Sequence, residues 1–494
     1  MNRRCRYRMA RSACGGFRTV CRTGAGEAPA GDEDGSQRSF RGRQMKKQKH
    51  YERNLCEGSL YKGILLFSLP LVFSNLLQVL FTMADLSLVG RYCGPEALGS
   101  VGSTTILITL FTGMLMGLGG AVNVVAARYM GAGNRKSLRE TVHTAAVLCF
   151  LAGVLMLLVE ILFGHAILRL LRTREELIGG ALLYIRIYFL GMPAMGLFNF
   201  GNAVLSASGD TRRPLCFLSI AGVVNVILNL LFVVGMKRNV DGVAMASVIS
   251  QCISAGLVLR VLLREDADYR LRLPELRITP RIAKNILSLG IPAALQNAVF
   301  AIANLFVQAG VNSFPAIVVE GNSAATNADA LVYDSMAAVY TACASFMSQN
   351  YGADRHDRVR KSYRISLLYS WLIGSLIGLS LVLSGRPFLG LFTKEEAVIA
   401  EGMHRLRVMG FSYGISAFMD CTIAASRALG RGLVPTIIVV LGSCVFRVLW
   451  IFTVFRHFRT IESIYLLYSA SWTITAIAEI AYYLRISRKL LRKS

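Results

Sequence analysis

The sequence predicts an all-α, polytopic membrane protein whose twelve transmembrane helices form two six-helix lobes. Three observations support this fold: a composition poor in charge, a series of long apolar runs, and an internal repeat. The chain has 494 residues, of which 54% are hydrophobic and 17% are charged. A typical soluble domain carries about 25% charged residues. The chain therefore lacks the charged residues needed to cover a surface that faces water on all sides.

The first 44 residues differ from the rest of the chain. The first 40 of them contain eight arginines and the acidic run 32–34, and the segment lacks an apolar run long enough for a signal peptide. Such a segment cannot bury a core, so we expect it to be a disordered basic leader. The more ordinary sequence from Met45 onward suggests that Met45 is the true start and that residues 1–44 are an upstream extension or a dispensable tail.

Apolar runs of about 20 residues, long enough to cross the ~30 Å hydrocarbon core as helices, follow one another from residue 62 onward. The first lobe, residues 45–263, is expected to hold spans near 62–88, 98–127, 140–163, 180–205, 214–236 and 242–263. A polar connector, 264–283, leads to the second lobe, residues 284–485. Its spans are expected near 284–313, 316–349, 364–385, 403–426, 435–455 and 461–484, before a basic tail, 486–494.

The distribution of basic residues predicts the orientation of these spans. With both termini inside, the inside segments from residue 41 onward hold 32 Lys and Arg, and the outside loops hold ten. Lys and Arg concentrate in cytoplasmic loops, so both termini are predicted to be cytoplasmic. The net charge of +25 then records membrane orientation, and no nucleic-acid partner is expected.

The two halves repeat each other. Pro70 aligns with Pro292 and Asn75 with Asn297, at an offset of 222. RYMGAGNRK (128–136) matches QNYGADRHD (349–357), and SASGDTRRP (206–214) matches RALGRGLVP (427–435), both at an offset of 221. Because each repeat has an even number of spans, both enter the membrane in the same direction. The lobes should be related by a pseudo-two-fold axis along the membrane normal, with a substrate pathway between them.

Polar residues inside the first lobe point to a cation site. Asn75, Gln78, Thr82 and Asp85 lie on one stripe of the first span. Asp85 could hold a proton or Na⁺, or it could simply be hydrated near the outer surface. Asparagine oxygens from the fifth span could complete a site for a hard cation, or these side chains could link helices. The asparagines are Asn225 and Asn229; a similar stripe on the fourth span, for which helix linking is favoured, holds Asn199, Asn202 and Ser206.

The second lobe offers further acidic and amide groups. Asp329, Asp334 and Asp420 fall within its spans and could bind a cation or a cationic substrate, or have a structural role in a hydrated cavity. A partial polar stripe on the seventh span holds Asn297, Asn304 and Gln308. Near the span ends, Glu160 and Glu479 are expected at the membrane surface, and Arg186 and Arg447 are candidates to pair with a carboxylate.

Several classes of enzyme are disfavoured because their motifs are missing. The sequence contains no GxxxxGK[ST] phosphate loop, no GxSxG and no HExxH, and its eleven cysteines form no CxxC pair. No set of nucleophile and base is apparent, so we do not expect an enzyme. Transport would then depend on an ion gradient or be passive.

At this point the sequence resembles the multidrug and toxic compound extrusion family of bacterial transporters, over roughly residues 55–485. The resemblance rests on FSLPLVFSNLLQVLFTMADLSLVGR (67–91), SASGDTRRP (206–214), GNSAATNADALVY (321–333), SQNYGA (348–353) and SRALGRGLVP (426–435). It implies export of cationic or amphipathic compounds in exchange for Na⁺ or H⁺.

The resemblance also implies roles for particular residues. Asp85 matches the family's first-helix aspartate, which takes part in cation coupling, and Asn225 matches an asparagine of the same polar site. Asn229 stands where several members have a second aspartate. In the second lobe, Asp420 lies where similar sequences often place an acidic residue, and Asp329 stands in place of a glutamate.

Taken together, we expect an antiporter of the bacterial inner membrane that works by alternating access and acts as a monomer among membrane lipids. The expected coupling site is Asp85, with possible Na⁺ binding, together with Gln78, Asn225 and Asn229. The expected substrate or second cation site combines Asp329, Asp420 and Asn297. No cofactor beyond the coupling ion is expected. The alternatives are a lipid-linked saccharide flippase of the same superfamily, and a membrane-embedded enzyme or receptor.

Overall fold

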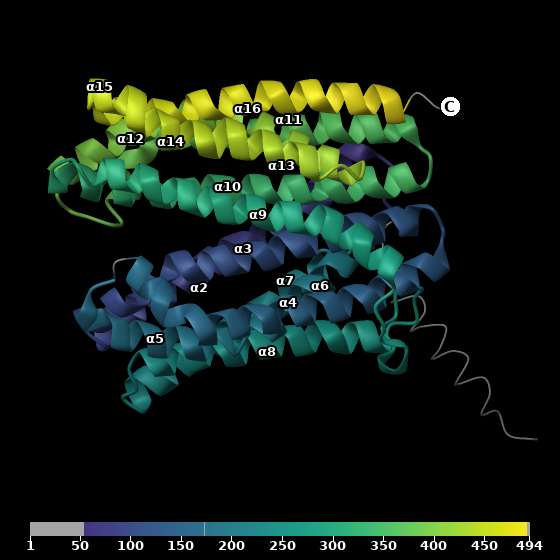
Figure 1. Cartoon of the computed structure of the whole chain (residues 1–494), viewed down its shortest axis with the longest axis horizontal. Coiled ribbons are helices and arrows are strands. Elements are labelled where there is room, and N and C mark those ends of the chain that lie inside the picture. The colour runs from purple at the N-terminus through teal and green to yellow at the C-terminus, as the bar shows by residue number, and fades with distance from the viewer. Residues whose placement is uncertain (1–53, 172, 492–494) are drawn as a thin grey trace, which may run out of the picture. The chain divides into compact units, whose positions relative to one another are not determined.

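The computed structural model describes residues 54–171 and 173–491, and all that follows concerns this part of the chain. The predicted leader, 1–44, and the last residues of the basic tail lie outside it. The described residues form helices joined by short connections, without a β-strand among them (Figure 1). The all-α prediction is therefore confirmed.

Helices of the first lobe lie at the predicted spans but extend beyond their ends. They are α2 (Leu60–Tyr92), α3 (Pro95–Gly131), α4 (Arg135–Leu170), α5 (Glu175–Phe189), α6 (Met192–Ala207), α7 (Arg212–Asn229) with the π-helical turn η1 (Leu230–Gly235), and α8 (Val240–Arg264). A short turn, η2 (Leu273–Glu275), lies in the connector.

The second lobe repeats this order. Its elements are α9 (Pro280–Val311), α10 (Ala316–Gly352), α11 (His356–Leu389), α12 (Glu396–Ala428), α13 (Leu433–Val439), η3 (Val440–Val445), α14 (Phe446–Trp450), η4 (Ile451–Phe455), α15 (Arg456–Phe458) and α16 (Ile461–Leu490). In Figure 1 the two lobes form separate groups of helices, coloured purple to teal and green to yellow.

One predicted span is broken. The run 180–205 was expected as a single helix, but α5 and α6 meet there at 45°. Pro193 lies in the first turn of α6, where it has no N–H to donate and its ring clashes with a preceding turn. The described residues thus hold eleven helices long and apolar enough to span a membrane, or twelve with this bent pair.

Backbone conformation confirms the internal repeat. Glycines with positive φ follow α6 and α12 at equivalent positions, Gly209 (90°) and Gly430 (81°). Lys237 (52°) and Arg459 (40°) form a second such pair at the opposite ends of the lobes. Positive φ is rare for residues other than glycine, so its recurrence at an offset of 221 or 222 shows that the two halves share one backbone path.

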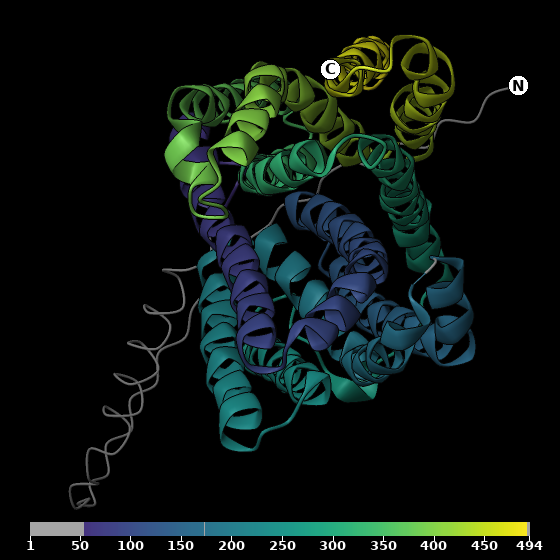
Figure 2. The same cartoon turned by 90° about the vertical axis from the view of Figure 1, so that its left-hand side faces the viewer.

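Each lobe sends one helix across the interface. α2 packs along α10 of the second lobe, and α9 packs along α3 of the first. Figure 2, viewed nearly along the helices, shows these two crossing helices at opposite edges of the interface. Between them α3 contacts α10, where the Ser345 hydroxyl donates to Asn123 Oδ1 at 3.0 Å.

The lobes contact each other closely at one end, which we call the basic end because the lysine- and arginine-rich segments, including 128–139, 264–284 and 352–364, lie there. A Cβ atom built on Gly131 would lie 1.8 Å from the carbonyl oxygen of Gln349, and one on Gly352 would lie 2.0 Å from that of Arg128. The Arg128 guanidinium donates to the Ala428 carbonyl at 2.9 Å, and the Gln349 amide donates to the Ala207 carbonyl at 3.2 Å. The two glycine contacts are related to each other by the internal repeat, and so are the two hydrogen bonds. Together these contacts close the basic end.

Candidate functional site

Packing of α2 against α7 sets the position of Asp85. Gly222 has no side chain, so the Phe81 ring lies directly on α7: a Cβ at Gly222 would be 1.8 Å from Phe81 Cε2. Asp85 follows Phe81 by four residues and Asn225 follows Gly222 by three, so both project from the same sides of their helices one turn further on. The Phe81–Gly222 contact therefore places Asp85 opposite the asparagines of α7.

A hydrogen-bonded group connects these residues. Asn229 Nδ2 donates to Asp85 Oδ1 at 2.5 Å and to Asn225 Oδ1 at 3.2 Å. Asn229 is fully buried, and its own Oδ1 has no hydrogen-bond partner among the described residues. It is the last residue before η1, and π-helical turns of this kind are frequent at functional sites.

The chemistry of this site is that of a lone carboxylate among neutral oxygens. Tyr184 and Tyr188 of α5 lie close enough for the Asp85 charge to act on them, whereas no cationic side chain in the described structure acts on Asp85. No group of three or more His, Cys, Asp or Glu that could hold a metal ion occurs among the described residues. A carboxylate with carboxamide oxygens suits a hard cation such as Na⁺, or a proton.

Other polar residues predicted for this stripe lie elsewhere. Asn75 donates to the backbone carbonyl of Asp334 on α10 at 2.8 Å, so it links the two lobes. The Gln78 side chain is half-buried and forms no hydrogen bond with the other described residues, and Thr82 is exposed and donates to the Gln78 backbone carbonyl. On α6, Asn199 and Ser206 bond within their own helix, the latter to Asn202.

In the second lobe, the structure gives Asp329 a cationic partner. Arg405 of α12 forms an ion pair with it at 2.5 Å, and the Tyr413 hydroxyl donates to its other oxygen. Arg405 also donates to Asn322 Oδ1 at 2.8 Å and is 4% exposed. The sequence places Arg405 within a span, and a buried arginine requires an acidic partner. The spacing of residues along the sequence does not show which second-lobe acid is the partner of Arg405.

Three further charged groups surround Asp420. It lies within electrostatic range of Arg427 and Arg447, and Arg427 in turn acts on Glu479. Arg447 is 2% exposed and donates to Asn304 Oδ1 at 3.0 Å and to Ser471 Oγ. It stands over the rings of Phe300, Tyr468 and Trp472. Asp329 and Asp420 are thus matched by arginines, whereas no cationic side chain in the described structure acts on Asp334 or on Asp85.

Glu160 and Glu479, which were predicted to lie near the membrane surface, are buried inside the helix bundle. Both are about ten residues from the nearest helix end, and they are 1% and 0% exposed. Neither carboxylate has a hydrogen-bond partner in the described part of the chain. The burial of both side chains was not predicted, because proximity to a predicted span end suggested contact with water.

A cavity of about 230 Å³ lies between the lobes. α3, α9, α10 and α12 contribute its lining, which includes Asn123, Asn297, Tyr340 and Arg427. Asn297 also donates to the Gly113 carbonyl at 2.7 Å, and the Arg427 guanidinium donates to Gln296 at 2.7 Å. The cavity lining therefore combines small residues and the Tyr340 ring with a single charged group, the Arg427 guanidinium.

Comparison with known proteins gives one consistent result. The profile of the MatE family matches residues 70–231 and 292–453. The chain is 26% identical to the probable multidrug resistance protein YoeA of Bacillus subtilis, over 87% of this chain and 95% of that protein. It is 23% identical to the probable multidrug resistance protein NorM of Thermotoga maritima, over 81% and 86%. The fold matches that of an outward-facing multidrug resistance transporter with a TM-score of 0.83, at 20% identity and over 89% and 98% of the two chains.

Proposed function

Because the chain belongs to the MatE family of multidrug and toxic compound extrusion transporters, we propose that it is a cation-coupled antiporter. It exports cationic or amphipathic compounds by alternating access, in exchange for Na⁺ or H⁺. The chain is a multi-pass membrane transporter and not an enzyme. What is proposed is the coupling, the residues that carry it and the chemical class of the substrate.

One observation supports the proposal: Asp85 is a partly buried carboxylate of α2 without a cationic partner in the described structure, and Asn229 donates a hydrogen bond to it. A buried charge without compensation is costly in a membrane, so binding of a cation or a proton at Asp85 stabilises the site. An ion can shift a conformational equilibrium only by binding the two states differently. Since α2 also crosses to the second lobe, where Asn75 contacts α10, occupancy of the site can favour one arrangement of the lobes.

For the substrate we propose the inter-lobe region of the second lobe, with Asp420, Asp329 and Asn297. Asn297 lines the cavity, and Asp420 lies near the cavity-lining Arg427. A cationic compound could be attracted to Asp420 if one of its arginine neighbours moved away. Alternating access would provide that movement, because the cavity walls come from both lobes.

The proposed orientation places the basic end in the bacterial cytoplasm, following the excess of basic residues there. The protein would act as a monomer in the inner membrane. A flippase for lipid-linked saccharides would need several basic groups around the pyrophosphate. The inter-lobe cavity offers Arg427 alone among its charged lining residues, which favours the drug antiporter.

The test is transport by purified protein in proteoliposomes under an imposed Na⁺ or pH gradient, with ethidium as substrate. We expect gradient-driven ethidium transport, which Asp85→Asn abolishes while the variant stays folded. Asp241→Asn, which removes an acid paired with Arg238 at a helix end, is the matched control and should transport normally. Full gradient-driven transport by Asp85→Asn at equal reconstitution would refute the assignment.

A further inference from the structure

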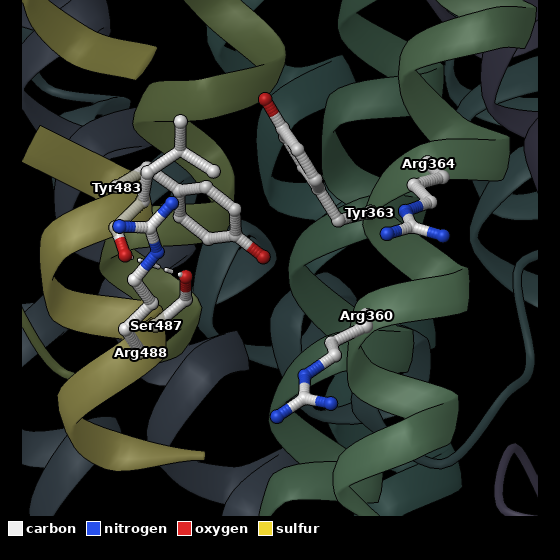
Figure 3. Close-up of a pocket in the computed structure, with 7 residues that line it drawn as sticks. Arg360, Tyr363, Arg364, Tyr483, Ser487 and Arg488 are labelled. Carbon is white, nitrogen blue, oxygen red and sulfur yellow. Dashed lines mark hydrogen bonds between the residues drawn. The ribbon is translucent and has the colours of Figure 1, made fainter. Parts of the chain in front are cut away.

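A cleft opens at the basic end between α11 and α16. Both helices pack on α12, and the space between them has a volume of about 340 Å³ (Figure 3). Arg360 and Arg364 reach it from α11, and Arg488 reaches it from α16. The cleft is separate from the Asp85 site and from the inter-lobe cavity, whose linings share no residue with it.

Two tyrosines form the floor of the cleft. The rings of Tyr363 and Tyr483 lie 4.3 Å apart and join the two helices. Both residues are buried, at 9% and 3% exposure. The Tyr363 hydroxyl is hydrogen-bonded to Thr422 of α12 at 2.9 Å, so the floor is fixed to the core of the lobe. The cleft is therefore a preformed apolar recess.

The rim of the cleft is strongly positive. Arg364 and Arg488 are exposed, and neither has an acidic partner among the described residues. Arg360 approaches Asp357 only at 3.9 Å and donates to the Leu491 carbonyl at 3.0 Å, which ties the end of α16 to α11. Three guanidinium groups thus line one recess with little compensating negative charge.

Position along the helices places the cleft at the membrane surface. Arg364 directly precedes the apolar part of α11, and Arg485 directly follows the apolar part of α16, which ends at Leu484. Leu368 and Leu484, which are 44% and 46% exposed, continue the apolar surface toward the membrane interior. The arginines therefore lie at the depth of lipid headgroups, with apolar surface on the membrane side.

We propose that this cleft binds the phosphate headgroup of an anionic phospholipid in the leaflet that meets the basic end. Guanidinium groups bind phosphate oxygens through directed, charge-assisted hydrogen bonds. Basic pockets between transmembrane helices are suited to such headgroups. The acyl chains extend along the apolar surface from Leu484, whereas the phosphate lies among Arg360, Arg364 and Arg488. The bound lipid links α11 to α16 at their basic ends.

Native mass spectrometry of the detergent-solubilised full chain tests this site. The protein is titrated with dioleoylphosphatidylglycerol and, separately, with dioleoylphosphatidylcholine. We expect a first bound lipid with a clear preference for phosphatidylglycerol. Arg364→Gln with Arg488→Gln should weaken its binding by roughly 10- to 30-fold, since each basic residue near an anionic lipid contributes about a fivefold change in affinity. The replaced side chains are exposed, so the fold should persist.

The matched control is Arg281→Gln with Lys284→Gln, two exposed basic residues on α9 at the same end of the protein. This pair should leave binding of the first lipid within about twofold of the wild type. Equal losses in both double variants would show a general attraction to positive charge and overturn the site. Absence of a preference for phosphatidylglycerol would also overturn it. Glycerol 3-phosphate provides a third arm: binding as tight as that of the lipid would identify a site for soluble phosphate esters and refute the lipid assignment.

Discussion

Asn75 and Asn297 make the same hydrogen bond from opposite sides of the lobe interface. Asn75 of α2 donates to the backbone carbonyl of Asp334 on α10 at 2.8 Å, and Asn297 of α9 donates to that of Gly113 on α3 at 2.7 Å. The donors are 222 positions apart and the acceptors are 221 apart, which is the offset of the sequence repeat. Both bonds hold a crossing helix to the opposite lobe near its middle.

Removal of either asparagine amide should weaken this lobe arrangement to a similar degree. Asn75→Leu and Asn297→Leu keep most of the side-chain volume but lose the donor, and interhelical hydrogen bonds in membranes contribute about 0.6 kcal/mol on average and up to about 1.7 kcal/mol. We expect a lowered midpoint of thermal unfolding in detergent for both variants. Asn327→Leu on α10 is the control, because its amide bonds only to its own helix. A loss confined to one of the two asparagines would contradict their equivalence.

The glycines of the closed basic end give a second prediction. Gly131→Ala places a methyl group 1.8 Å from the Gln349 carbonyl oxygen, so α3 and α10 must separate there. The side-chain Oε1 of Gln349 accepts a hydrogen bond from the Leu55 backbone amide at 2.8 Å. Cys56, the next residue along the chain, is 6% exposed. Burial raises the pKa of the Cys56 thiol, which keeps it protonated and slow to react at neutral pH. Separation of the helices should expose Cys56, lower its pKa toward the ordinary value and accelerate its alkylation.

Peptide mass spectrometry after maleimide treatment measures this effect, with the exposed Cys216 and Cys252 as internal references. Gly102→Ala on the same helix α3 is the matched control, since its added Cβ would meet nothing within 4 Å. Cys56 should react faster in Gly131→Ala than in either the wild type or Gly102→Ala. Equal rates in all three proteins would show that the basic end is not held closed by this contact.

The fold could be predicted largely from the sequence because its signals are local. Apolar length fixed the spans, and motifs such as SASGDTRRP (206–214) and RALGRGLVP (427–435) showed the repeat. The 45° break between α5 and α6 was not predicted, because the run 180–205 is apolar throughout and Pro193 is compatible with a helix start as well as with a kink.

Site residues were predictable only where helical spacing within one span carried the signal. The spacing of Asn225 and Asn229 identified one polar face, and the structure brings both to Asp85. The partner of Asp329 was not predictable, since Arg405 lies 76 residues away on another helix. Nor does the repeat help, because the equivalents of Asn225 and Asn229 in the second lobe are Phe446 and Trp450. The backbone is repeated, whereas the chemistry of the two lobes is not.

Packing between Phe81 and Gly222 should control the geometry of the Asp85 site. In Gly222→Ala the added methyl would lie 1.8 Å from the Phe81 ring, and such overpacking costs about 1–3 kcal/mol. We expect α2 and α7 to separate, with loss of the Asn229–Asp85 bond and reduced gradient-driven transport. Gly256→Ala on α8 meets nothing within 4 Å and should behave as the wild type.

Phe81→Leu combined with Gly222→Ala removes the steric conflict, and transport by this double variant should recover in part. A double variant as impaired as Gly222→Ala alone would indicate that Gly222 acts through something other than the Phe81 contact. Transport in proteoliposomes, compared with unfolding midpoints in detergent, separates a displaced site from a destabilised protein.

The ion pair between Asp329 and Arg405 supplies the last prediction. Removal of one member of a buried pair costs about 3–5 kcal/mol, because the remaining charge is left without compensation. Asp329→Asn leaves Arg405 without its acidic partner, and Arg405→Met leaves the Asp329 charge with only the Tyr413 hydroxyl and more distant groups. Both single variants should therefore unfold at clearly lower temperature than the wild type. The double variant should be more stable than the sum of the single effects predicts, since it buries no unpaired charge.

Arg407→Met is the control, because Arg407 lies on the same helix but is exposed, and it should change the unfolding midpoint little. If Arg405→Met were no more destabilising than Arg407→Met, the pair would contribute nothing to the stability of the second lobe.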